Sequence, residues 1–239
     1  DFVARASVET ALGGFSSDLN LKIAPSGAPA SYKGRIGLAA FDIGRFLALE
    51  QYMGRVSLNT QIQGSGLSKE KIAAKLQGSI ASIDCNGYTY SGITLSGEMA
   101  KGLFRGAVQV RDPNAALDFN GNVDFTSAVP VFDFTASLQH ARPALLRFFG
   151  QDTASLLSAG LVSHFSGTGP DNISGTIDIS DLVYRENGHT YKMARFMVDA
   201  SSAGAVRTLS LASDIADAEV KGVYDFSGMA AAFSAMLSH

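Results

Sequence analysis

Residues 117–125 read LDFNGNVDF and alternate apolar with polar side chains without a break. Residues 132–138 (FDFTASL) and 72–80 (IAAKLQGSI) keep nearly the same period of two. Because successive side chains of a β-strand point to opposite faces, this period places one face in an apolar environment and the other in water. That pattern is typical of antiparallel sheets, whereas buried parallel strands read as continuous apolar runs. The sequence therefore predicts an all-β, antiparallel fold.

Turn residues separate the alternating runs. Asn-Gly pairs suit two-residue hairpin turns because both central positions need a positive φ. Lysine-glycine, alanine-glycine and Asp-Pro-Asn sequences mark further turns between runs. We therefore predict five tight turns, at residues 86–87, 101–102, 112–114, 187–188 and 203–204.

Three segments have apolar residues at helical spacing. They are residues 43–53, residues 143–149 with a possible extension over 153–157, and residues 229–237. Pro143 favours a helix start because proline is well suited to the first helical turn. The sequence thus predicts strand blocks bounded by short helices, at roughly residues 1–55, 56–160 and 161–239.

A finer repeat, apolar–x–Gly–x–apolar, places a glycine on the apolar side of a strand. A glycine in a strand interior costs about 0.5–1 kcal/mol relative to alanine, so a repeated glycine calls for a structural reason. Glycine permits a sharp bend or the close approach of another backbone, and we expect these residues to curl the sheet into a trough. The seven are Gly34, Gly78, Gly97, Gly106, Gly121, Gly175 and Gly222.

Composition limits the possible functions. Charged residues make up 17% of the 239 residues, against about 25% in ordinary soluble domains. The excess apolar surface must lie in a core, an interface or a ligand channel, since the longest nearly apolar run, residues 228–237, is about half of what a membrane helix needs. The net charge of −3 is scattered, which predicts no nucleic-acid partner. The chain begins at Asp1 without a leader, and we expect it to be an excised segment of a longer protein.

No catalytic or metal-binding constellation is recognisable, so we expect no enzyme activity and no cofactor. The four histidines (140, 164, 189 and 239) have no partner at metal-ligand spacing, and Cys85 stands alone, which leaves the redox compartment open. Asp112 belongs to an Asp-Pro-Asn turn. Residues 172–174 match a glycosylation sequon that we expect to be unused.

Several stretches resemble the TamB proteins of the Bacteroidetes type. They are residues 86–90 (NGYTY), 93–97 (ITLSG), 102–106 (GLFRG) and, as the most specific piece, 112–121 (DPNAALDFNG). The resemblance covers roughly residues 50–140. It implies the AsmA-like superfamily of bridge proteins: an inner-membrane anchor, a long periplasmic β-taco with an apolar groove that carries phospholipid between membranes, and an Omp85-type outer-membrane partner. It implies no catalytic residue.

We therefore expect a curved antiparallel sheet folded into a β-taco or half-barrel, with short helices over its openings. Its role would be a non-catalytic periplasmic conduit for phospholipid acyl chains. The expected lining residues are Leu76, Ile80, Leu95, Phe104, Val108, Leu117, Phe119, Val123, Phe125, Phe132, Phe134 and Leu138.

Three alternatives remain open from the sequence. The aromatic face could be the core of a packed sandwich. The trough could be a scaffold that assembles or translocates outer-membrane barrel proteins by adding strands at its edges. The chain could also be part of an integral outer-membrane barrel, although its short loops and lack of tryptophan argue against that.

Overall fold

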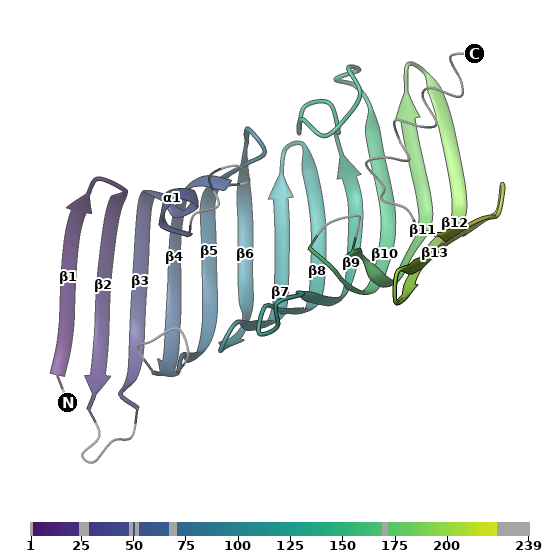
Figure 1. Cartoon of the computed structure of the whole chain (residues 1–239). Coiled ribbons are helices and arrows are strands. Elements are labelled where there is room, and N and C mark those ends of the chain that lie inside the picture. The colour runs from purple at the N-terminus through teal and green to yellow at the C-terminus, as the bar shows by residue number, and fades with distance from the viewer. Residues whose placement is uncertain are drawn as a thin grey trace.

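The computed structural model describes residues 2–23, 29–47, 50, 53–66, 71–168 and 172–223. These residues form one antiparallel sheet of fourteen strands in which each strand pairs only with its neighbours in sequence (Figure 1). Strands account for 75% of the structure, against the usual 20–25%. The predicted all-β, antiparallel fold is confirmed. The strands are β1 (Phe2–Thr10), β2 (Gly13–Lys22), β3 (Ser31–Asp42), β4 (Met53–Ser65), β5 (Ala73–Cys85), β6 (Tyr88–Ala100), β7 (Leu103–Asp112), β8 (Ala115–Asp124), β9 (Val131–Ala141), β10 (Leu156–Ser166), β11 (Ser174–Glu186), β12 (His189–Ala203), β13 (Val206–Ser213) and β14 (Ala218–Gly222).

The sheet is open, with β1 at one edge and β14 at the other. The boundaries expected near residues 55 and 160 fall inside β4 and β10, and the sheet continues through both without a break. All described strands therefore belong to one continuous body.

All five predicted turns join consecutive strands. The Asn-Gly turns lie between β5 and β6 and between β11 and β12, and both residues of each have a positive φ, as their sequence requires. Lys101 and Gly102 also have positive φ, of 50° and 93°. We call the end of the sheet with the Asn-Gly turns its upper end, and the end with the Lys101-Gly102 turn its lower end.

Two of the three helix predictions need correction, and the third, residues 229–237, lies outside the described residues. Among the described residues of the first, Ile43–Leu47 form α1, residue 50 is in a turn, and Met53 already begins β4. Asp42 caps α1 by accepting a hydrogen bond of 3.0 Å from the backbone N–H of Arg45. In the second, residues 143–149 form successive turns, and Leu156 and Leu157 belong to β10. The backbone leaves the helical region at Arg147, whose φ is +63°.

The predicted glycines mark a line along which the sheet bends. Gly97, Gly106 and Gly121 are direct cross-strand partners on β6, β7 and β8. A Cβ atom added to any of the three would lie 2.3–2.7 Å from a carbonyl oxygen of the next strand. The neighbouring backbone therefore occupies the space that a side chain would need on the apolar side, as expected on the inner side of a bend. The lower parts of β7 to β13 turn away from their upper parts in Figure 1.

The other glycines of the repeat divide into two groups. A Cβ atom at Gly34, Gly78 or Gly175 would lie 2.0–2.3 Å from a backbone oxygen of the adjacent strand. Gly222, at the edge strand β14, has nothing within 4 Å, so close approach does not explain it. At six of the seven glycines, the backbone of an adjacent strand therefore approaches as closely as the sequence predicted.

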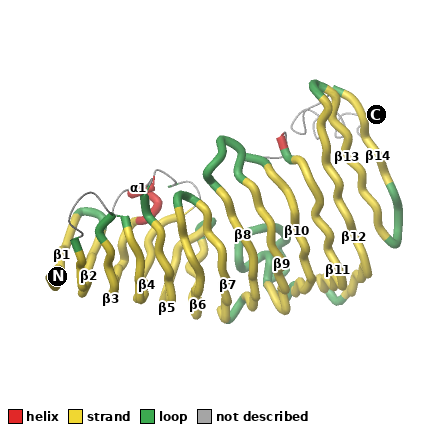
Figure 2. Tube along the Cα trace, turned by 90° about the horizontal axis from the view of Figure 1, so that it is seen from below, coloured by secondary structure: helices red, strands yellow, loops and turns green. Residues whose placement is uncertain are grey.

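A second line of irregularities crosses the sheet near its upper end, and the sequence analysis did not predict it. The strand register shifts between Leu38 and Phe41, between Leu157 and Ala159 and between Ser158 and Gly160. Further shifts occur in the β4–β5 and β8–β9 pairs. Such bulges bend a strand and increase its local twist. In the view of Figure 2 the strands follow a bent course rather than lying flat.

The bend predicts that Gly106→Val is strongly destabilising. The added Cβ would lie 2.3 Å from the backbone oxygen of Ser96, and we expect a loss of about 3 kcal/mol in the free energy of unfolding. Ala107→Val, next along β7 on the opposite face, should cost under about 1 kcal/mol. Urea unfolding measures the free energy of unfolding of both variants. Equal effects would show that the glycine line is not under steric constraint.

Candidate functional site: an uncovered apolar face

Eleven of the twelve predicted lining residues lie on one face of the sheet, which we call the apolar face. Cross-strand pairing arranges them in four parallel rows. The rows contain Ile80, Leu117 and Leu138; Leu95, Val108 and Phe119; Leu76 and Phe134; and Phe104, Val123 and Phe132. Gly97, Gly106 and Gly121 complete the third row, between Leu76 and Phe134.

Phe125 is the exception among the twelve. It lies one residue beyond β8 at the lower end of the sheet, and it is 60% exposed. Its ring meets Phe132 edge-on, with centroids 6.2 Å apart. The alternation that suggested Phe125 runs past the end of the strand, so this residue borders the apolar face at its lower end.

In the part of the chain that the structure describes, no second layer of sheet lies over the apolar face. All eleven residues on the face are half-buried rather than fully buried. A compact monomer of 25.0 kDa exposes about 10,200 Å², whereas this chain exposes 14783 Å². A packed sandwich would have buried Phe119 and Phe134, whose rings instead contact each other within one layer at 5.0 Å. The sandwich alternative does not describe this sheet.

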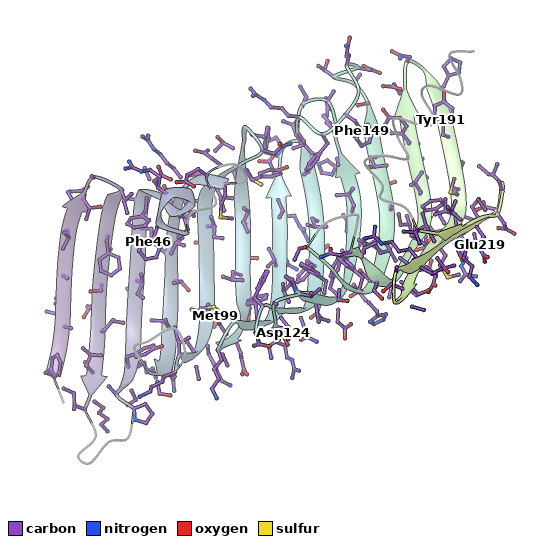
Figure 3. The ribbon with its side chains drawn as sticks, viewed as in Figure 1. Phe46, Met99, Asp124, Phe149, Tyr191 and Glu219 are labelled. Atoms are coloured by element: carbon purple, nitrogen blue, oxygen red, sulfur yellow. The ribbon has the colours of Figure 1, made fainter. Side chains whose placement is uncertain are left out.

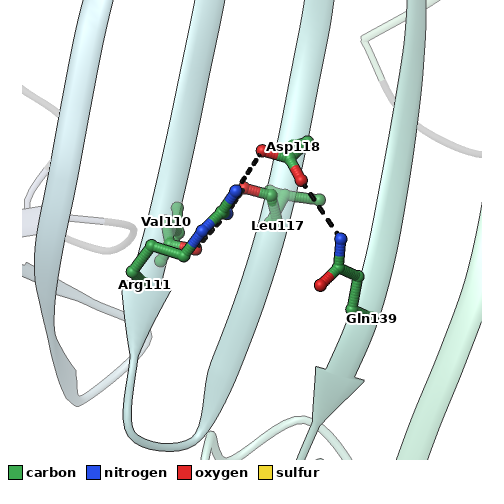
Figure 4. Close-up of polar contacts among 5 residues, drawn as sticks. All are labelled: Val110, Arg111, Leu117, Asp118 and Gln139. Carbon is green, nitrogen blue, oxygen red and sulfur yellow. Dashed lines mark hydrogen bonds and ion pairs between the residues drawn. The ribbon is translucent and has the colours of Figure 1, made fainter.

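Charge is nearly absent from the apolar face. Among the positions that β2 to β10 direct to this side, the sole charged residue is Asp112, at the upper end of β7. The opposite face carries ion pairs across adjacent strands, such as Lys75–Glu98 and Arg111–Asp118. Arg111 donates to Asp118 at 2.6 Å, and Gln139 of β9 donates to the other carboxylate oxygen at 3.4 Å (Figure 4). The sheet therefore has one apolar and one hydrated side.

Asp112 is 4% exposed, and hydrogen bonds compensate its charge. The Tyr88 hydroxyl donates to Oδ1 at 2.5 Å, and the Ser91 hydroxyl and backbone N–H each donate to Oδ2 at 2.9 Å. The backbone N–H of Asn114 donates to Oδ1 at 2.8 Å. Burial alone would raise the pKa of the Asp112 carboxyl, but these hydrogen bonds together outweigh burial and lower that pKa below its usual 3.8. Asp112 thus joins the β5–β6 and β7–β8 hairpins.

Burial raises the pKa of two residues beside this network. Burial raises the pKa of Tyr90 to about 12, and its ring meets that of Tyr88 edge-on at 4.8 Å. Burial also raises the pKa of the Cys85 thiol, which disfavours the nucleophilic thiolate. His164 forms an exposed pair with Asp133 at 2.8 Å, across β9 and β10. Among the described residues, no three His, Cys, Asp or Glu side chains are grouped so that they could hold a metal ion.

A segment that we call the strap, residues 142–155, covers the upper end of the apolar face. Leu146 is 3% exposed and forms a buried cluster with Ala115 and Ala141. The side chains that pack against this cluster are Tyr88, Tyr90, Leu138 and Leu157. Asn86 donates a side-chain hydrogen bond of 2.9 Å to the backbone oxygen of Arg147, and Asp152 accepts one of 2.8 Å from the backbone N–H of Asn187. The strap therefore connects the β5–β6 turn with the β11–β12 turn. A covering segment was expected here, although as a helix.

Three cavities, of about 830, 780 and 550 Å³, lie over β1 to β7. Their linings mix positions from both faces of the sheet, for example Tyr32 and Lys33. Of the predicted lining residues, Leu76 and Leu95 take part in them. The aromatic residues of β7 to β9 line none of the three.

No protein-family model, curated protein or solved structure matches this chain. Within the described part of the chain, no helix has the length and apolar character that crossing a bilayer requires.

The Asp112 network predicts a pH-dependent contribution to stability. Because the pKa of Asp112 is lowered in the folded state, its contribution is present above the unfolded value of 3.8 and is lost as the pH falls through the folded value. We expect Asp112→Asn to cost about 2–3 kcal/mol at neutral pH. The difference from the unaltered protein should shrink as the pH falls below 3.8.

Chemical denaturation at several pH values measures this difference. Asp133→Asn, which alters an exposed pair on the opposite face, is the control and should cost under about 1 kcal/mol. An Asp112→Asn penalty that stays constant from neutral to acid pH would contradict the role assigned to the carboxylate.

Proposed function

We propose that this chain is a non-catalytic segment of a lipid conduit, in which phospholipid acyl chains lie along the apolar face in the periplasm. The observation that carries the proposal is a continuous, half-buried apolar face without a covering layer across many strands. A protein whose stability depended on that surface would be expected to bury it, since exposed apolar patches of this extent mark binding surfaces. The resemblance of residues 50–140 to TamB proteins points to the same role between an anchored inner-membrane end and the outer membrane.

The chemistry of the face suits a hydrocarbon. Burial of each CH₂ group contributes about 0.8 kcal/mol, so a sixteen-carbon chain in water costs on the order of 13 kcal/mol. A lipid that crosses an aqueous compartment therefore needs a continuous apolar surface. From β2 to β10 this face presents no lysine or arginine that would hold a phosphate headgroup, and its one carboxylate, Asp112, already accepts four hydrogen bonds. A bound phospholipid would therefore be recognised by its acyl chains.

The dimensions of the sheet agree with such a role. Fourteen strands at a spacing of about 4.8 Å make a sheet about 60 Å across. One acyl chain spans about 15 Å, half of a 30 Å hydrocarbon core. Several lipids in a row could therefore occupy this segment, with their headgroups in water beyond the ends of the strands.

A second candidate function is a scaffold for outer-membrane proteins, with an Omp85-type partner. The open edge of β1 favours it, because Phe2, Val3 and Val8 are about half exposed there. An unpaired edge offers backbone groups to an incoming strand. Strand addition would use the edge, whereas lipid transfer would use the face, so probes on the face separate the two functions.

Photo-crosslinking distinguishes the two faces. A photoreactive residue at Phe119 or Phe134, on the apolar face, should capture lipid in cells. The matched positions Asn120 and Thr135 are cross-strand partners on the opposite face and should capture none. Extraction and mass spectrometry of the adducts give the readout. Equal lipid labelling at all four positions would indicate non-specific membrane contact and refute the proposal.

Val123→Asp tests transport directly. Val123 is half-buried between Phe104 and Phe132, where a carboxylate can still be hydrated from the open side. We expect a moderate loss of about 1–2 kcal/mol in stability, a folded sheet, and far less co-purifying lipid. Thermal melting and lipid extraction measure these effects, and the full-length variant should also lose outer-membrane integrity. A folded variant that keeps normal lipid content and function would show that Val123 does not line the path.

A further inference from the structure

The strap carries an exposed aromatic patch that the proposed conduit does not use. Phe148 is 62% exposed and Phe149 is 53% exposed. Leu146, two residues before Phe148, is buried on the side of the strap that faces the sheet. The ring of Phe149 meets Tyr184 at 5.8 Å, and Tyr184 stacks on Tyr191 at 6.3 Å. Tyr191 is itself 56% exposed. We call Phe148, Phe149 and Tyr191 the lip patch; Phe149 and Tyr191 lie along the upper edge of the sheet in Figure 3.

The exposure of the lip patch is built into the fold. The strap is fixed by the bond from Asn86 to Arg147, by the bond from Asn187 to Asp152, and by the buried Leu146. Two of its residues, Arg147 and Gly150, have positive φ, of 63° and 78°, and they flank the two phenylalanines. The backbone thus turns Leu146 inward and holds the next two aromatic residues outward. A segment held in this way presents both rings to whatever lies above the upper end of the sheet.

The stretch of sequence around the two phenylalanines carries basic residues. Residues 134–151 contain Arg142 and Arg147 and no aspartate or glutamate. The Arg147 guanidinium lies beside the exposed Gly87, where a Cβ would be 2.9 Å from its nitrogen. Two carboxylates also lie near the patch: Asp152 already accepts backbone hydrogen bonds from Ala154 and Asn187, and Glu186 lies beside Gly150.

The size of the patch decides between a protein partner and a bilayer. An aromatic side chain can bury 150–250 Å², so three rings that are about half exposed offer roughly 350 Å². A stable protein interface takes about 800 Å² from each partner. A bilayer needs less, because a few aromatic side chains at the headgroup level, with a nearby arginine, suffice for peripheral attachment.

We infer that the lip patch is a docking site for the interfacial region of an anionic lipid bilayer, with Phe148 and Phe149 inserted and Arg147 at the headgroups. The inference goes beyond the proposed conduit, because it concerns the outer side of the strap and would hold whatever the apolar face carries. The docked orientation would bring the upper end of the sheet to the membrane surface.

Vesicle co-sedimentation of the whole chain tests the inference. The unaltered protein should bind vesicles of phosphatidylcholine with phosphatidylglycerol more tightly than pure phosphatidylcholine vesicles. The double variant Phe148→Ser/Phe149→Ser should bind both about thirtyfold more weakly, because two partly inserted rings are lost. Arg147→Gln should bind the anionic vesicles about fivefold more weakly and the neutral ones equally. Val129→Ser/Val131→Ser, an exposed apolar pair at the lower end of the sheet, is the matched control and should bind as the unaltered protein does.

Three outcomes would overturn the inference: no vesicle binding by the unaltered protein, equal binding by the double serine variant, or equal loss in the valine control. A further arm separates docking from the conduit. Val123→Asp alters the apolar face alone, so it should bind vesicles normally even if it no longer carries lipid. Vesicle binding lost in Val123→Asp but retained in the double serine variant would place the membrane contact on the apolar face and refute the lip patch. A cooperative melting transition above the assay temperature confirms that each variant is folded.

Discussion

The structure depends on an unbroken ladder of backbone hydrogen bonds between strands that follow one another in sequence. No second layer among the described residues supports the apolar face, so the pairing of each strand with its neighbours must hold the sheet together. Among the described residues, buried apolar side chains form two small clusters, one around Tyr32 and Ile62 and the other around Leu146, and a few more, such as Val56 and Ile93, are buried outside them. Stability of this kind is close to a sum over neighbouring pairs, as in solenoid repeat proteins. It leaves one face available for binding without loss of the fold.

The two lines of irregularity shape that face. Along the glycine line, a missing side chain lets the adjacent backbone approach on the apolar side. Along the upper line, bulges and residues with positive φ such as Ala40 and Asp181 bend the strands again. A flat sheet would offer its apolar face equally to all partners, including other flat sheets. A bent one disfavours stacking on another sheet and suits a flexible ligand, which is the physical basis for proposing acyl chains.

The sequence predicted those features whose signal is local. Period-two alternation is set by the geometry of a single strand, and the positive φ of Asn86-Gly87 is set by the two residues themselves. The same alternation placed eleven lining residues on one face, because register follows from the hydrophobic pattern. The strap was predicted as a helix because it begins at Pro143 and continues through Leu145, Leu146, Phe148 and Phe149. In the structure Pro143 and Leu146 are buried, both phenylalanines are exposed, and Arg147 reverses the backbone. A spacing rule cannot tell which of several apolar residues will be covered by a neighbouring side chain.

The bulges could not be predicted either, since one extra residue in a strand leaves no mark on its composition. Phe125 was misplaced by one residue because alternation does not show where a strand ends.

Pairing between sequence neighbours alone has a consequence for how such a molecule is made and modified. Each hairpin can form as soon as its second strand leaves the ribosome, so no strand has to wait for a distant partner. Contacts of low sequence separation close quickly, which limits the time for which apolar strands are exposed to aggregation. The insertion or deletion of one hairpin would change the span of the sheet by about 10 Å and leave every other pairing intact. A protein built in this way can be adjusted in length by simple duplication of hairpins.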